Sequence, residues 1–199
     1  FVRKNAYDES KAPQPLRWVH YGDNGELKFT DAGNALTYLR KVLAIEGNVL
    51  TLDVPIVHEL DPANMRITVG RLETPMLRNC GMEELTITAE EEEGAAPESS
   101  IGTTLMIKGL VNGLFRNVEI ASFRTIAFGT AYPVNVSFIN CTAANAINCG
   151  GGGSGYGFYI RGQNLLYRDC TASNLRHGYT TAAPQTSNIV IKDCRSLDY

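Results

Sequence analysis

Four short segments of the chain share one alternation of apolar and polar residues. Each begins with Asn, alternates through the next four residues, and ends in Asn or Asp followed by Cys or Val. A weaker fifth segment, residues 84–87, precedes them, and the five start at residues 84, 112, 135, 164 and 188. A period of roughly 20–30 residues predicts stacked repeats rather than one closed core. The four segments are residues 112–118, 135–141, 164–170 and 188–194.

Alternation within a strand assigns each side chain to the interior or the exterior. In the third segment Leu165 and Tyr167 are expected to point inward, and Leu166 and Arg168 outward. The fourth segment repeats this with Ile189 and Ile191 inside, and Val190 and Lys192 outside. The outward residues include a second stripe formed by Arg116, Arg168 and Lys192, interrupted by Ile139, which is either solvated or a partner surface.

Two further strands complete each repeat. A strand often led by Gly comes first, at residues 105–108, 126–129, 157–161 and 178–181, and a short strand opening with Cys-Thr-Ala or Cys-Arg-Ser comes last. Three strands and their turns use up the period, so the repeat predicts an all-β parallel β-helix. The recurring turn residues Asn117, Asn140, Asp169 and Asp193 tolerate left-handed geometry and are expected to stack as a ladder.

Residues 81–199 resemble the right-handed parallel β-helix superfamily of pectate-lyase-like and phage tailspike-like proteins. The likeness lies in the coil order of Gly-aliphatic strand, turn, Asn-aliphatic strand, Asn and third strand. It implies a right-handed solenoid, a carbohydrate-related role, and ligand sites on the first strand of each coil.

The first part of the chain lacks the repeat. Residues 38–45 and 49–54 flank Glu46-Gly47-Asn48 and predict a β-hairpin, while residues 65–69 predict another strand. Residues 1–37 carry Pro13 and Pro15 and are expected to be irregular. We therefore divide the chain into a lead-in segment, 1–63, and β-helix coils, 64–199. No capping repeat is recognisable at the end, so truncation at the C-terminus is expected.

Composition narrows the possible partners. A net charge of −3, from 18 basic and 21 acidic residues, argues against a general nucleic-acid binder. No apolar run approaches the ~20 residues of a membrane span. Cys141, Cys170 and Cys194 share one coil position and are expected to be small buried residues, with disulfide pairing as the alternative, and Cys149 is the expected exposed thiol.

Outward positions on the first strands gather the candidate functional residues. Arg161 can bind a carboxylate in two-pronged fashion, Tyr159 offers a sugar-stacking ring, and His177 can move a proton. A lyase acting on an acidic polysaccharide needs such groups, so the expected catalytic residues are His177, Arg161 and Tyr159. The expected substrate-binding residues are Lys108, Tyr159, Arg161 and Thr180. Outward positions of any soluble β-helix are polar, however, so the same residues are also compatible with a solvated face.

Paired carboxylates are not recognisable on that face, which a glycosidase would need. Asp169 and Asp193 align on the turn after the second strand, and the acidic run of residues 90–93 lacks the alternating ligands of a calcium loop. We therefore expect no metal and no cofactor.

Two functions remain open. The chain is either a secreted carbohydrate-active protein that binds or cleaves an acidic polysaccharide, lyase-like if an enzyme, or a structural module of an extracellular or viral fibre. Its expected partners are a polysaccharide or neighbouring protein chains, outside the cell or on a cell or virion surface.

Overall fold

The computed structural model describes residues 2–7, 37–57, 60, 65–69, 76–88, 103–150, 153–181 and 186–197. Within these ranges the chain forms β-strands and no helix. It divides into two compact units, one of residues 1–75 with 183–185 and one of residues 76–182 with 186–199.

The first unit holds a small antiparallel sheet and a hairpin. The sheet has the order β2 (Thr37–Tyr38), β1 (Val2–Tyr7) and β5 (Met65–Val69). The hairpin pairs β3 (Val42–Glu46) with β4 (Val49–Leu52), and Gly47 adopts the positive φ of 59° that the tight turn needs. Strand 65–69 is confirmed, and so is the hairpin, except that its first strand begins at Val42 rather than at Tyr38, which belongs to β2 and pairs with β1. The expectation of irregular structure is wrong for Val2–Tyr7, which pairs along β5, and residues 8–36 lie outside the described part.

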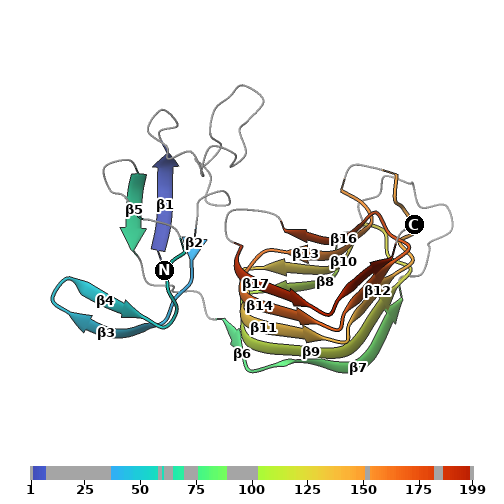
Figure 1. The fold of residues 1–199 in the computed structure, drawn as a ribbon, viewed down its shortest axis with the longest axis horizontal. Coiled ribbons are helices and arrows are strands. Elements are labelled where there is room, and N and C mark those ends of the chain that lie inside the picture. Colours follow the sequence, from blue (N-terminus) through green and yellow to red (C-terminus); the bar gives the residue numbers. More distant parts are fainter. Residues whose placement is uncertain are drawn as a thin grey trace. The chain divides into compact units, whose positions relative to one another are not determined.

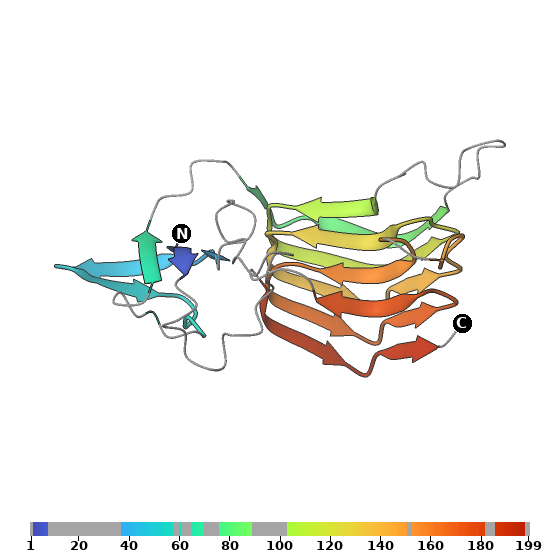
Figure 2. The same ribbon diagram turned by 90° about the horizontal axis from the view of Figure 1, so that it is seen from above.

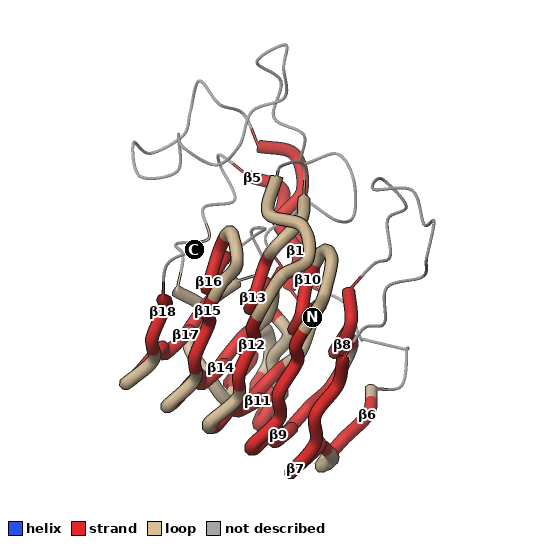
Figure 3. Tube along the Cα trace, turned by 90° about the vertical axis from the view of Figure 1, so that its right-hand side faces the viewer, coloured by secondary structure: helices blue, strands red, loops and turns tan. Residues whose placement is uncertain are grey.

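The second unit contains a four-stranded parallel sheet built from the first strand of each repeat. Its order is β8 (Thr103–Lys108), β10 (Ile126–Ala131), β13 (Tyr156–Ile160) and β16 (His177–Thr181). These strands lie far apart in sequence but side by side in space (Figures 1 and 3). We call this sheet the first wall.

The other strands of each repeat form a nine-stranded sheet that bends along its length. The long strand β9 (Leu110–Ala121) pairs with β11 (Val134–Ile139) over one half and with β12 (Thr142–Ala144) over the other. Later repeats add β14 (Gln163–Arg168), β15 (Thr171–Ser173), β17 (Ser187–Lys192) and β18 (Arg195–Leu197), and β6 (Leu77–Arg78) and β7 (Gly81–Thr88) pair with the opposite side of β9. Figure 2 shows the repeats layered in chain order.

The parallel register confirms the predicted repeat at its four main segments. Val136 pairs with Leu165, and Leu165 pairs with Ile189, so equivalent apolar residues stack in one column. The fifth segment was misaligned. Glu84 stacks on Asn117 through a side-chain hydrogen bond, whereas Asn79 is the true equivalent of Asn112 and accepts from its amide at 3.1 Å. The error arose because residues 89–102 lengthen this repeat, so that its spacing departs from the others.

Left-handed residues recur at the corners of the repeats, as predicted. Asn112, Asn117 and Ser122 have φ of 57°, 54° and 56°, and the same spacing holds in the following two repeats. The asparagine side chains join neighbouring repeats, since Asn140 donates to Asn117 at 2.7 Å and Asn174 donates to Asn145 at 2.9 Å. The predicted turn residues Asp169 and Asp193 also adopt positive φ.

The core of the second unit is organised by two columns of stacked rings. Phe115, Phe138 and Tyr167 form one column, with centroids 5.0 and 4.6 Å apart. Phe128, Phe158 and Tyr179 form the other, at 4.8 and 4.9 Å. The two columns meet edge to face, which is a favourable arrangement of ring quadrupoles. This contact holds the first wall against the nine-stranded sheet.

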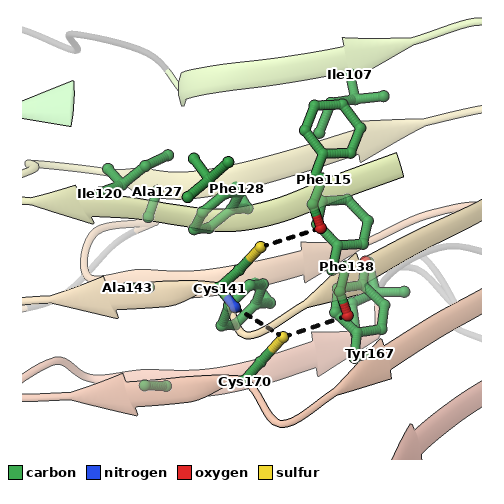
Figure 4. Close-up of a cluster of buried hydrophobic side chains, with 14 of the residues drawn as sticks. Ile107, Phe115, Ile120, Ala127, Phe128, Phe138, Cys141, Ala143, Tyr167 and Cys170 are labelled. Atoms are coloured by element: carbon green, nitrogen blue, oxygen red, sulfur yellow. Dashed lines mark hydrogen bonds between the residues drawn. The ribbon is translucent and has the colours of Figure 1, made fainter. Parts of the chain in front are cut away.

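The cysteines form no cross-links, and Cys141 and Cys170 are buried as expected, whereas Cys194, expected to be buried with them, is only half-buried. All five are free, and Cys141 and Cys170 are fully buried beside the first ring column. Their Sγ atoms lie 3.4 Å from the carbonyl oxygens of Phe115 and Phe138 (Figure 4). The expectation that Cys149 is the exposed thiol is wrong, because Cys149 is half-buried and Cys80, on the outer repeat, is exposed.

Candidate functional site

The outer side of the first wall carries the candidate residues. Phe158 and Ile160 are fully buried, which leaves Tyr159 and Arg161 on the outside, as predicted. Tyr159 pairs in register with Thr180 of β16. Alternation breaks near the start of β10 and β13, because Ala127 and Phe128 of β10 and Gly157 and Phe158 of β13 are consecutive buried residues. Tyr156, the residue before this buried pair in β13, therefore faces outward with Tyr159.

Tyr156 and His177 occupy that outward starting position. They are register partners, and their rings lie 5.0 Å apart at a tilt of 33°. The Tyr156 ring also meets the Tyr159 ring edge-on at 5.6 Å. The Arg161 guanidinium lies over the Tyr159 ring, with its Cζ 4.6 Å from the ring centroid. His177, Tyr156, Tyr159 and Arg161 thus form a continuous series of contacts, which we call the aromatic row.

Backbone and side-chain hydrogen bonds hold Arg161 in place. Its Nη2 donates to the Tyr159 hydroxyl at 2.5 Å, and its backbone N–H donates to Oγ1 of the buried Thr130 at 2.8 Å. Thr130 Oγ1 in turn donates to the Tyr159 carbonyl at 3.2 Å. Arg161 Nε is shielded from solvent, so an anion would have to bind at the two Nη atoms, which carry four N–H donors, one of them directed at the Tyr159 hydroxyl.

Of the predicted residues, His177, Tyr159 and Arg161 belong to this row, and Thr180 lies beside Tyr159 in the register of β13 and β16. Lys108 stands apart at the end of β8, because Ala131 of β10 occupies the position between it and β13. Lys108 on β8 therefore lies two strand spacings, about 9–10 Å, from the edge of β13 that carries Arg161. At that distance Lys108 suits a second subsite rather than contact with the same group as Arg161.

Two details of the site differ from the sequence-based expectation. His177 is the first residue of β16 itself rather than the residue before the strand. Tyr156 was missed, because strict alternation places it inside with Phe158. The signal that could have identified it is the register of the Gly157 and Gly178 strands, which pairs Tyr156 with His177.

Carboxylates and metal ligands do not gather within the described residues. No group of three His, Cys, Asp or Glu side chains there is close enough to hold a metal ion. Asp169 and Asp193 are exposed turn residues. Oδ2 of Asp169 lies 3.4 Å from Nε of Arg168, and Oδ2 of Asp193 lies 3.9 Å from Nζ of Lys192. They lie on the turn after β14 and β17, away from the first wall. The acidic segment 90–93 lies outside the described part of the chain.

An open depression lies elsewhere, between the repeat that contains β6 and β7 and the neighbouring strand β9. Its lining residues are Asn79, Cys80, Gly81, Glu83, Asn112 and Leu114. It belongs to the β7 edge rather than to the first wall, and its Glu83 is paired with Arg116 at 2.8 Å.

Comparison with known proteins finds no family model, no curated protein and no solved structure that matches this chain. In the part of the chain that the structure describes, no helix is long and apolar enough to cross a membrane.

Proposed function

We propose that the second unit is a right-handed parallel β-helix of the pectate-lyase-like and tailspike-like type, and that its aromatic row binds an acidic polysaccharide. The proposed setting is outside the cell or on a cell or virion surface. The parallel register of three strands per repeat and the turn asparagines support the architecture.

The observation that carries the binding proposal is the contact series from His177 through Tyr156 and Tyr159 to Arg161. Tyrosine rings provide flat apolar surfaces for sugar rings while their hydroxyls hydrogen-bond. Arg161 is already oriented by Tyr159, so less conformational entropy is lost when its guanidinium binds a carboxylate. This combination favours a uronic-acid polymer over a neutral glycan.

The same residues suit cleavage by elimination. The oxygen of Tyr159, which lies 2.5 Å from Arg161 Nη2, would accept the proton from the carbon next to the sugar carboxylate, while Arg161 neutralises that carboxylate as negative charge develops. The electron pair of the C–H bond forms a C=C bond, the glycosidic C–O bond at the adjacent carbon breaks, and the leaving oxygen keeps that electron pair and takes the proton back from Tyr159. His177 pairs in register with Tyr156, five residues before Arg161, which is roughly 15 Å along the strand, so His177 would contact a neighbouring sugar of the same polymer. The His177 ring is exposed, so a substrate can approach it.

The binding proposal is tested by affinity electrophoresis through gels that contain polygalacturonate, alginate or a neutral glucan. The wild-type protein should be retarded by at least one uronic-acid polymer and not by the glucan. Tyr156→Ala and Arg161→Gln should abolish the retardation. Arg168→Gln is the matched control, because Arg168 lies on β14, outside the first wall. Equal retardation of the Arg161→Gln and Arg168→Gln proteins would overturn the proposal.

Cleavage is tested separately by the absorbance of the unsaturated product. Tyr159→Phe should abolish product formation, and product formation that persists in this variant would remove Tyr159 from catalysis without affecting the binding proposal. His177→Ala should leave the cleavage step in place and change the free energy of unfolding by under about 0.5 kcal/mol, as is usual for an exposed residue. A large loss of stability in the His177→Ala protein would indicate a structural imidazole.

The alternative is a structural module of an extracellular or viral fibre, in which the stack itself is the function. It is favoured by the parallel register, which continues without interruption from β9 through β11 and β14 to β17.

A further inference from the structure

One side chain takes the place of backbone in the ladder that joins β10 to β13. The backbone pairing of these two strands ends at Gly129 and Tyr159, although β10 remains paired with β8, and β13 with β16, beyond that point. If the register continued, Thr130 would stand opposite Ile160. A parallel ladder would then join the Thr130 backbone to the Tyr159 C=O and the Arg161 N–H, which flank the residue opposite.

The Thr130 hydroxyl meets both of these groups instead. Its Oγ1 accepts a hydrogen bond from the Arg161 N–H at 2.8 Å and donates one to the Tyr159 carbonyl at 3.2 Å. A hydroxyl has one donor and two acceptor positions, so a single side chain can serve an N–H and a carbonyl at once. The Thr130 side chain therefore bridges β10 and β13 where their backbone pairing stops.

Thr130 is a buried hydroxyl in an otherwise apolar environment. It is 1% exposed, and the residues level with it on β8 and β13 are Ile107 and Ile160, which are also buried. Burying a hydroxyl among apolar side chains is costly unless it is hydrogen-bonded. The Tyr167 hydroxyl, at the end of one ring column, lies within hydrogen-bonding reach of Thr130 from the core side, which restricts the rotamers of Thr130.

The two backbone groups that Thr130 holds belong to one contact of the aromatic row. The Arg161 guanidinium lies over the Tyr159 ring, with its Cζ 4.6 Å from the centroid, and its Nη2 donates to the Tyr159 hydroxyl. Arg161 itself lies just beyond the end of β13. Its backbone is therefore held by the Thr130 hydroxyl rather than by a strand ladder.

We propose that Thr130 is a positioning residue, whose hydroxyl fixes the backbone on both sides of Ile160 and thereby sets the place of the Arg161 guanidinium over Tyr159. The consequence for ligands rests on the proposed function, in which Arg161 receives the carboxylate of a uronic acid. Thr130 is buried and does not touch the ligand. Loss of its hydroxyl should therefore change binding through Arg161.

Two substitutions separate positioning from packing. Thr130→Val keeps the shape of the side chain and removes the hydroxyl, whereas Thr130→Ser keeps the hydroxyl and leaves a methyl-sized gap. If Thr130 only fills the core, the Ser protein should be the more disturbed of the two. Positioning by the hydroxyl predicts the opposite order.

Amide hydrogen exchange of the Arg161 N–H, followed by NMR, measures the positioning without any ligand. Exchange should be slow in the wild-type and Thr130→Ser proteins, and about 10-fold faster or more in the Thr130→Val protein, which lacks the acceptor. The Thr171 N–H, which donates to the Cys141 carbonyl at 2.9 Å, is the reference for any global change in stability. Equal protection of Arg161 in the Val and Ser proteins, relative to Thr171, would overturn the inference.

Calorimetric titration measures the consequence, with an oligosaccharide of galacturonate or of alginate, whichever polymer retards the wild-type protein. Thr130→Val should weaken binding about 10-fold and Thr130→Ser much less. Added to Arg161→Gln, Thr130→Val should have little further effect. Undiminished binding by the Thr130→Val protein, or equal weakening with and without Arg161, would overturn the inference.

Failure of the proposed function gives a different result. If the wild-type protein binds neither oligosaccharide, the proposed function is overturned, and exchange of the Arg161 N–H still decides whether Thr130 positions it. Thermal unfolding checks that each variant is folded. If Thr130→Val does not fold, Thr130→Cys takes its place, because a thiol is a weaker donor and acceptor. Its Arg161 N–H should exchange faster than that of the Ser protein, and equal protection would overturn the inference.

Discussion

At the scale of single residues, the turn asparagines account for much of the fold. A non-glycine residue with positive φ costs roughly 1–2 kcal/mol unless its side chain favours that conformation, and Asn is among the few that do. Asn140 combines a φ of 51° with a side-chain hydrogen bond of 2.7 Å to Asn117. The left-handed conformation of Asn140 and its side-chain hydrogen bond to Asn117 together fix the corner between β11 and β12.

The two contributions of Asn140 can be separated by urea denaturation. Asn140→Gly keeps the backbone conformation and removes only the ladder hydrogen bond, which should cost about 0.5–1.5 kcal/mol. Asn140→Ala removes both and should cost roughly 1 kcal/mol more than the Gly variant. A Gly variant that is less stable than the Ala variant would contradict a conformational role for this residue.

At the scale of strands, sequence reasoning succeeded where alternation is regular. It placed Leu165, Tyr167 and Phe158 inside and Arg168 outside, and the structure confirms each. It failed where the backbone departs from a two-residue period. The consecutive buried pair in β10 and its equivalent in β13 turned Tyr156 outward, and no local pattern in the sequence reports such an irregularity. The long connection before β8 likewise hid Asn79 as the start of the first repeat.

The stacked ring columns lead to a pH dependence of stability. Burial raises the pKa of Tyr167 and of Tyr179 above the ordinary value. A raised pKa in the folded state means that the unfolded chain loses its protons first as pH increases. The stability that comes from burying the neutral tyrosine is therefore fully present below the unfolded tyrosine pKa of about 10. Above that value it declines by about 1.4 kcal/mol per pH unit for the fully buried Tyr167, and by less for the partly exposed Tyr179.

Replacement of Tyr167 isolates its share of this effect. Tyr167→Phe keeps the stacking with Phe138 and removes one ionisable group, so its free energy of unfolding should fall less steeply above about pH 10 than that of the wild type. Chemical denaturation at a series of pH values measures both slopes, and equal slopes for the wild-type and Tyr167→Phe proteins would contradict the assigned burial effect.

At the scale of the whole molecule, the net charge of −3 limits how an anionic polymer can be held. Long-range attraction is weak, so binding depends on the local cation Arg161, with Lys108 as a second contact further along the first wall. The logarithm of the binding constant should therefore fall with the logarithm of salt concentration with a slope of about one to two. Duplex DNA should not compete. A much steeper slope or competition by DNA would indicate a distributed basic surface instead.

The most direct test of the central claim is a coupling measurement between Arg161 and the ligand carboxylate. Calorimetric titrations would compare a uronic-acid oligosaccharide with its carboxyl-reduced form, each on the wild-type and Arg161→Gln proteins. If Arg161 binds the carboxylate, reduction should weaken wild-type binding by about 10-fold or more and should have little effect on the Arg161→Gln protein. Equal weakening of both proteins, or no binding by the wild type, would contradict the assignment of the aromatic row as an acidic-polysaccharide site.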